Sequence, residues 1–276
     1  RIRRSSSPIR PVAGSASATS SRIDHGVSLS DTHRKAHAHV RLTHRRVGHM
    51  SELDQADSML APHPLLALFR NAADGRFLPA DGRVTVLPAL LRGLECSVAF
   101  TGHAVIATAL PAREVQSREP DGYGGSLAPD FLRYLAGQGG RIGTLDAVLV
   151  ARGTSGLPRL PQRLDAEDHP RVRHARDLRT GVHVYGDERG LVTLADGLAG
   201  RRELSIELDQ PGGGSNNSSG LGRSLLRDAL TLVPAGEPVF AAVSPGNARS
   251  LRAFLAAGFV PLGSEVIIRP ERTSAG

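Results

Sequence analysis

The chain has 276 residues, enough for one large or two modest domains with a substantial core. Apolar residues make up 40% and charged residues 22% of it, as in ordinary globular proteins, and no apolar run approaches the roughly 18 residues of a membrane span. A single cysteine, Cys96, excludes an intramolecular disulfide and a cysteine-based metal site. We therefore expect a cytoplasmic protein with no metal and no membrane partner.

The net charge of +7 has its source at the N-terminal end of the chain. Residues 1–49 hold nine arginines and one lysine against Asp24 and Asp31, so they carry +8 and the remainder carries −1. Residues 1–60 are predicted to be a disordered basic leader, because large apolar side chains are scarce there. A leader without function, a targeting peptide and a basic arm for nucleic acid all remain open. The rest of the chain is not basic, so nucleic acid is not its expected partner.

Between residues 61 and 160 the pattern predicts an N-terminal α/β domain. Cys96 lies within a strand-like alternation, which indicates a small core residue. His103 lies at a Gly-containing turn, which favours a surface histidine over a base. A break rich in Gly and Pro at 152–158 predicts a domain boundary near 160. Helices are expected over 64–73 and 129–136, and strands over 83–87, 95–100, 104–110 and 145–150.

From residue 161 to 276 a second domain is predicted. A helix over 165–177 precedes a hairpin whose turn is 186–189. The strand that follows alternates Leu204, Ile206 and Leu208 with polar residues, the pattern of a half-buried strand. A loop rich in Gly, Ser and Asn leads into a helix with an apolar stripe over 221–233. A strand over 238–243 and a helix over 248–257 complete the pattern.

The glycine-rich loop and the helix after it predict a phosphate-binding turn. A helix N-terminus offers unpaired N–H groups and the positive end of the helix dipole. Gly220 and Gly222 lack Cβ atoms and permit close approach, while Arg223 adds a cation. A glycine-rich connection without a ligand is the alternative. A Walker loop is excluded because no lysine precedes Ser224, and a dinucleotide fingerprint because Leu225 replaces its third glycine.

Two segments, Asn217–Gly222 and Asn247–Phe259, together resemble the GNAT superfamily of N-acetyltransferases over roughly residues 165–270. Members carry a Gln/Arg-x-x-Gly-x-Gly/Ala turn that holds the acetyl-CoA pyrophosphate, then an Asn-x-x-Ser/Ala helix that ends in Gly-Phe. The resemblance implies an α/β fold, with a mixed, mostly antiparallel sheet flanked by helices. The additional N-terminal α/β domain would shape the acceptor site or be a degenerate copy of the same fold.

This resemblance implies that an acetyl group passes directly from acetyl-CoA to the primary amine of a small molecule or peptide. Glu207 is the candidate general base through a water molecule, and a solvated strand charge is its alternative reading. Ser244, Tyr123 or water would protonate the leaving thiolate. The candidate cofactor-binding residues are Ile206, Leu208, Asn217, Ser219, Gly220, Leu221, Gly222, Arg223, Ser224, Asn247 and Ser250.

Two departures from the family pattern favour a second function. Asn217 stands where the family has Gln or Arg, and Phe254 stands where many members carry a tyrosine general acid. Both changes suit a non-catalytic acyl-CoA sensor or scaffold on the same fold. The sequence leaves the acceptor amine and the oligomeric state open.

Overall fold

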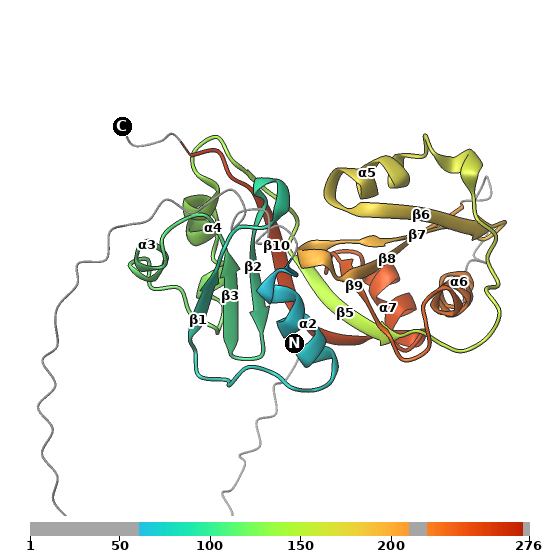
Figure 1. The fold of residues 1–276 in the computed structure, drawn as a ribbon, viewed down its shortest axis with the longest axis horizontal. Helices are drawn as coiled ribbons and strands as arrows, with labels where there is room; N and C mark the ends of the chain where they lie inside the picture. The colour runs from blue at the N-terminus through green and yellow to red at the C-terminus, as the bar shows by residue number, and fades with distance from the viewer. Residues whose placement is uncertain (1–60, 210–219, 273–276) are drawn as a thin grey trace, which may run out of the picture. The chain divides into compact units, whose positions relative to one another are not determined.

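Ten short apolar or alternating segments pair into one mixed sheet in the computed structural model, which describes residues 61–209 and 220–272 (Figure 1). Every pairing is antiparallel except β1 with β3 and β8 with β9. The predicted α/β class with a mixed, mostly antiparallel sheet is confirmed. In sheet order the strands are β1 (Val84–Leu87), β3 (His103–Ala107), β2 (Glu95–Phe100), β10 (Val260–Arg269), β5 (Asp146–Arg152), β9 (Pro238–Val243), β8 (Arg202–Leu208), β7 (Gly190–Asp196) and β6 (Thr180–Asp187), and β4 (Arg141–Ile142) pairs with β10.

Helices cover both faces of this sheet. One face, called here the α2 face, is covered by α2 and α5, whose apolar residues join cores that contain Val148 and Val184 respectively. The opposite face, called the α6 face, is covered by α4, α6 and α7. Helix α6 follows its predicted stripe, because Leu225 and Leu226 are fully buried. The helices are α2 (Pro64–Ala73), α3 (Ala112–Gln116), α4 (Pro129–Ala136), α5 (Pro170–Leu178), α6 (Leu221–Ala229) and α7 (Ala248–Ala256).

The sheet runs without a break across the predicted domain boundary near 160. Strand β10, which comes last in the chain, pairs with β2 on one side and β5 on the other. Strand β5 in turn pairs with β9. Segments from before and after residue 160 therefore alternate in the middle of the sheet. The division at 160 stays a prediction, and the predicted disordered leader, residues 1–60, lies outside the described residues.

An aromatic cluster fills the centre of the α2 face. Phe69 of α2 packs edge-on against Phe100 and Phe240, with ring centroids 5.7 and 5.6 Å apart. Cys96 lies in the same core and is fully buried, which confirms its predicted place.

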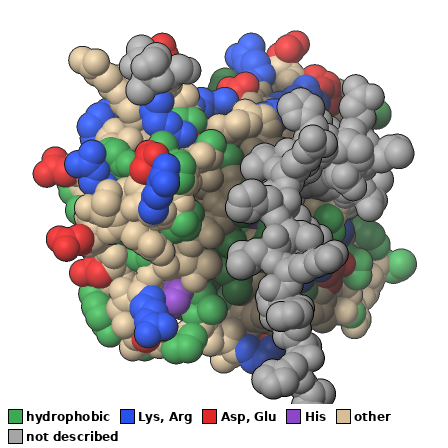
Figure 2. Space-filling model, turned by 60° about the vertical axis from the view of Figure 1, so that its left-hand side comes forward, with side chains coloured by type: hydrophobic (Ala, Val, Ile, Leu, Met, Phe, Trp, Pro, Cys, Tyr) green, Lys and Arg blue, Asp and Glu red, His purple; other side chains and the backbone are tan. Residues whose placement is uncertain are grey.

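On the molecular face drawn in Figure 2, basic and acidic side chains are interspersed, with no patch of a single sign. Within the described part of the chain, no helix has the length and apolar character needed to cross a membrane.

Candidate functional site

Strands β8 and β9 run parallel and pair at a single position, Glu203 with Phe240. Beyond it, β8 continues alongside β7 and β9 continues alongside β5, so the two strands no longer pair with each other. Asp209 N–H donates to Arg189 O at 3.1 Å across the β7–β8 ladder. Because an antiparallel ladder alternates, the backbone groups of the preceding residue, Leu208, point away from β7, toward β9. That edge of β8 carries N–H and C=O groups for an extended ligand.

The predicted residues Ile206 and Leu208 lie on this edge, and their side chains pack against the core of the α6 face. Gly222 of α6 lies next to them. A Cβ atom at Gly222 would come within 3.3 Å of the Ala253 Cβ and 3.6 Å of the Leu208 Cδ1. The absence of a side chain at 222 therefore lets α6 lie close to both α7 and β8. A valine there would disturb this packing as well as any bound anion.

Helix α6 begins without a side-chain cap. Gly220 precedes it with a φ of +96°, in the left-handed region that favours glycine. No acceptor among the described residues takes the N–H groups of Leu221, Gly222 and Arg223 in the first turn, the groups that would face a phosphate. Arg223 is exposed and has no polar partner among the described residues. Two predicted contacts of this turn, Asn217 and Ser219, lie outside the described residues.

Ser224 contacts the neighbouring hairpin instead of facing open solvent. Its hydroxyl donates to Leu221 O at 3.0 Å and accepts from Arg189 Nη1 at 3.1 Å. Arg189 lies in the β6–β7 turn and also pairs with Asp187 and Asp228. This network fixes the start of α6 against the hairpin. The cofactor contact predicted for Ser224 stays a prediction, and its observed role is positional.

Asn247 caps α7, as its sequence position predicts. Its Oδ1 accepts the N–H of Ser250 at 3.0 Å, and its side chain is exposed beside the end of β9. A contact between either residue and the pantetheine arm stays a prediction. Phe254 on the same helix is buried and packs edge-on against Phe259, with ring centroids 4.9 Å apart. This position provides no hydroxyl for a leaving thiolate.

Glu207, the predicted base, points to the α2 face and forms an ion pair with Arg171 of α5. Arg171 Nε donates to Glu207 Oε2 at 3.0 Å, and the glutamate side chain is 43% exposed. Its role as base stays a prediction.

Sequence reasoning missed a buried ionic network on the same face. Arg201, which precedes β8, is fully buried and donates to Glu203 at 2.8 Å and to Glu265 at 2.7 Å. Arg179 donates to Glu203 from the other side at 2.7 Å. The Arg201 guanidinium also lies 4.3 Å from the centroid of the Phe69 ring. A charge inside a predicted strand, Glu203, was the available signal, but the alternation alone does not say what covers it.

Asp146 of β5 belongs to this network and has an altered proton affinity. It stands directly opposite Glu265 in the β5–β10 ladder. Burial first, and then the negative charges of Glu265 and Glu203, raise the pKa of Asp146 to about 6. Burial also raises the pKa of Glu265, against the effect of Arg201. Burial acts in the same direction on Glu203, but Arg201 and Arg179 outweigh it and lower that pKa to about 2.

The prediction of a surface histidine at 103 is wrong. His103 begins β3 and is 5% exposed. Its Nδ1 contacts Asp81 Oδ1 at 2.9 Å and its Nε2 contacts Thr85 Oγ1 at 2.9 Å. Two polar partners satisfy the ring, which explains how a histidine is buried at the start of β3.

Tyr123, a candidate proton donor to the thiolate, is far from the start of α6. It is 71% exposed, and its hydroxyl donates to Ala80 O at 3.3 Å. Its ring lies beside Gly82 and Gly102, next to the β2–β3 turn. Strands β2, β10, β5 and β9 separate β3 from β8, which at about 4.8 Å per strand is on the order of 20 Å. This position does not favour the thiolate role.

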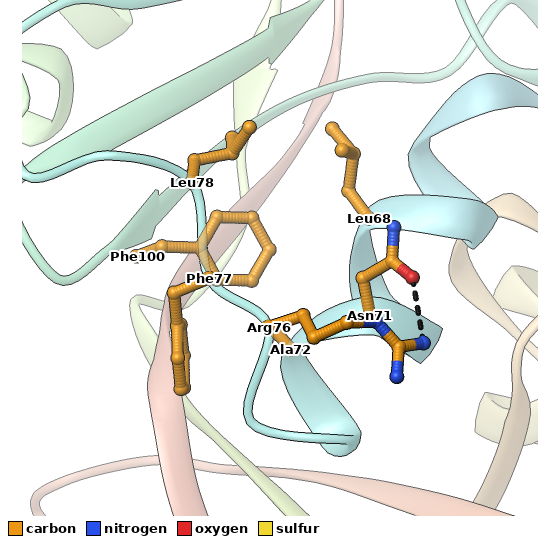
Figure 3. Close-up of a pocket in the computed structure, with 7 residues that line it drawn as sticks. All are labelled: Leu68, Asn71, Ala72, Arg76, Phe77, Leu78 and Phe100. Atoms are coloured by element: carbon orange, nitrogen blue, oxygen red, sulfur yellow. Dashed lines mark hydrogen bonds between the residues drawn. The ribbon is translucent and has the colours of Figure 1, made fainter.

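Two small cavities of the described structure lie away from the point where β8 and β9 diverge. One of about 220 Å³ lies between α2 and the loop after it, and its lining includes Leu68 and Leu78 (Figure 3). To one side of it, Arg76 Nη2 donates to Asn71 Oδ1 at 3.0 Å. Another of about 240 Å³ is lined by the first residues of β8 and β9, at the end opposite their divergence. Both volumes fall below the usual 300–1,000 Å³ of small-molecule sites. Among the described residues, no cluster of three metal-ligating side chains is present.

Cys96 is expected to be chemically inert. Burial raises the pKa of its thiol to about 12. The native protein should therefore leave an aromatic disulfide reagent unreacted near pH 8 and consume one equivalent after denaturation. Fast reaction of the native protein would contradict this. Cys96→Ala should also keep any acyl-transfer activity. A mechanism that passes through an acylated Cys96 would lose its activity in this variant.

Comparisons with known proteins leave the family open. No protein-family model matches the chain, and no curated protein matches it. Among solved structures, it is similar to a functionally unknown conserved protein from Staphylococcus epidermidis ATCC 12228. That likeness has 13% identity and a TM-score of 0.32, and it covers 53% of this chain and 68% of the other. That likeness is too weak to indicate a family or a function for this chain.

Proposed function

We propose that the chain is an acetyl-CoA-dependent N-acetyltransferase with a GNAT-like core over residues 161–276. The observation that carries this proposal is the divergence of β8 and β9 after the pair Glu203–Phe240, with α6 as the next described element after β8 and a glycine N-cap that offers no capping side chain. A diverging pair of parallel strands exposes backbone donors and acceptors to the amide groups of pantetheine. The first turn of α6 offers N–H groups to a pyrophosphate.

The order of elements supports the same proposal. The antiparallel run β6–β7–β8, the helix α6, the parallel strand β9 and the Asn-capped helix α7 follow one another as the GNAT resemblance implies. Strand β5, from the N-terminal segment, lies between β9 and β10. In this proposal the N-terminal α/β segment completes the sheet beside the cofactor strands and shapes the acceptor side.

A non-catalytic acyl-CoA-binding protein is the second candidate. The buried packing of Phe254 against Phe259 favours it, because no hydroxyl is available at the position of the usual general acid. Calorimetric titration with acetyl-CoA tests the site that both candidates share. Release of CoA in the presence of a panel of amines then separates them, since a sensor binds acetyl-CoA without turnover. The absence of acetyl-CoA binding would reject both.

Arg223→Ala is expected to weaken acetyl-CoA binding by about three- to tenfold, as loss of one exposed cation beside a phosphate would. The control is Arg227→Ala, which removes an equally exposed arginine one turn later on α6. Neither change touches the core, so both variants should keep the wild-type melting temperature. Raising the salt concentration should narrow the difference in affinity between wild type and Arg223→Ala. Equal losses from the two variants would argue against a phosphate at this turn.

A further inference from the structure

Five charged side chains meet on the α2 face between β8 and β10, and their charges do not balance. The carboxylates are those of Asp146, Glu203 and Glu265, and the guanidiniums are those of Arg179 and Arg201. With every group ionised, one negative charge is left without a cation. Burying an ionised carboxylate costs free energy unless a cation or hydrogen-bond donors offset the loss of its contacts with water.

The uncompensated charge lies on Asp146 and Glu265. Both oxygens of Glu203 are satisfied, because Oε1 accepts from Arg201 and from Leu198 N–H, and Oε2 accepts from Arg179. Glu265 uses Oε1 for Arg201, but its Oε2 has no partner in the described structure although the residue is 2% exposed. The Asp146 carboxylate forms no hydrogen bond or ion pair with any described residue.

This pair of carboxylates can be reached from solvent and adjoins the diverging strands. Asp146 is only half-buried, whereas Glu265 is enclosed beside it at the directly opposite position. Through the β5–β9 register, Ala242 and Ser244 share the face of Asp146, and both are half-buried. Their small side chains leave room for a ligand group near the end of β9, where β8 and β9 have separated.

We propose that Asp146 and Glu265 bind the ammonium group of the acceptor and that Asp146 takes its proton. This inference rests on the proposed acetyltransferase function. The ammonium loses one proton to Asp146, and the neutral nitrogen forms a bond to the thioester carbonyl carbon. The C–S bond then breaks, and the second proton lost by nitrogen goes to sulfur, so that CoA leaves as the thiol. Asp146 returns its proton to solvent after the amide is released.

The surplus negative charge also sets the class of acceptor. A primary alkylammonium supplies the missing positive charge, whereas an amine that carries a nearby carboxylate adds a second negative charge at the same place. The site therefore selects amines with no carboxylate close to the nitrogen. A pKa of Asp146 raised to about 6 by burial and Glu265 leaves this carboxylate ionised near pH 7.5 and still able to hold a proton.

The test is a calorimetric titration of the full chain, without acetyl-CoA, against three small probes of similar size. We expect propylammonium to bind, and both propanol and β-alanine to bind at least tenfold more weakly. Asp146→Asn, which preserves shape, should weaken propylammonium binding at least tenfold. Asp130→Asn, a change at an exposed aspartate at the start of α4, should leave it unaltered. Equal binding of propylammonium and propanol, or full affinity in Asp146→Asn, would overturn the inference.

Proton linkage gives a second readout that a purely structural role would not produce. Binding of a cation should favour the ionised carboxylates, so propylammonium should release protons near pH 6 and bind more tightly at pH 7.5 than at pH 5. Glu265, Glu203, Arg179 and Arg201 all face Asp146, but in Asp146→Asn the proton release should fall. Unchanged release in that variant would assign the linkage to another group and count against Asp146.

A parallel titration with acetyl-CoA separates this inference from the proposed function. Asp146→Asn should bind acetyl-CoA with wild-type affinity. If acetyl-CoA fails to bind wild type while propylammonium binds through Asp146, the cation site survives and the proposed acetyltransferase does not. If acetyl-CoA binds and propylammonium has the same affinity for wild type and Asp146→Asn, the proposed function survives and this inference fails.

Discussion

Replacing Arg201 with alanine is expected to lower the free energy of unfolding by about 3–5 kcal/mol. The guanidinium is fully buried, donates to Glu203 and Glu265, and lies against the Phe69 ring. Removing it leaves two buried carboxylates without their shared cation and opens a cavity between helix and sheet. Urea denaturation followed by circular dichroism measures the change.

The neighbouring residue supplies a matched control. Arg202 forms an ion pair with Glu237 at 3.2 Å, but both side chains are about one-third exposed, so Arg202→Ala should cost no more than about 1 kcal/mol. The difference in free energy of unfolding between wild type and Arg201→Ala should also become smaller at low pH. Loss of the Arg201 charge should move the folded-state pKa values of Glu203 and Glu265 upward from those in wild type, because Arg201 lowers both. Protonation of these carboxylates as pH falls should then cost the variant less stability than it costs wild type. Similar losses in the two variants would show that the ionic network contributes little.

If Arg201→Ala fails to fold, a triple variant keeps the test open. Arg201→Met combined with Glu203→Gln and Glu265→Gln removes the three most deeply buried charges together and restores an apolar contact with the Phe69 ring. Arg179 remains charged and keeps an acceptor oxygen at position 203. Buried ion networks replaced as a unit by neutral groups are often tolerated. We expect this variant to fold and to be more stable than Arg201→Ala. A triple variant no better than Arg201→Ala would assign the loss to packing alone.

Local patterns predicted the elements of this fold better than their arrangement. The stripe through Leu225 and Leu226 and the cap at Asn247 depend on neighbours in sequence, and both appear as expected. The place of β10 between β2 and β5 depends on pairing across more than a hundred residues. No periodicity within β10 identifies its partners, so the mixed middle of the sheet was not predicted.

The candidate site shows the same limit. Alternation along β8 correctly placed Glu203 and Glu207 on the face opposite Leu204. It could not show that Arg201 buries Glu203, or that Arg171 of α5 already pairs with Glu207. His103 was misplaced for a related reason. Its two partners, Asp81 and Thr85, lie about twenty residues earlier and become neighbours only through the parallel β1–β3 pairing.

Asp146→Asn is expected to lower kcat for acetyl transfer to an alkylamine by about 10²-fold or more, the lower range for loss of a general base. The Asp146 carboxylate has no hydrogen-bond partner in the described part of the chain and can hold a proton near neutral pH, whereas Glu207 is engaged by Arg171. Glu207→Gln should therefore reduce kcat by less than about fivefold. Steady-state kinetics with saturating acetyl-CoA compares the two variants directly.

The pH profile distinguishes a base from a residue that merely shapes the site. In wild type, kcat/KM should rise through about pH 6, since Asp146 must be ionised to accept a proton and its pKa is raised to that value. Glu265 interacts with it, so the limb reports the pair and not one carboxylate alone. Asp146→Asn should flatten this limb, and Glu207→Gln should leave it in place. If instead Glu207→Gln flattens the limb and Asp146→Asn keeps it, Glu207 is the base and Asp146 serves only to attract the amine.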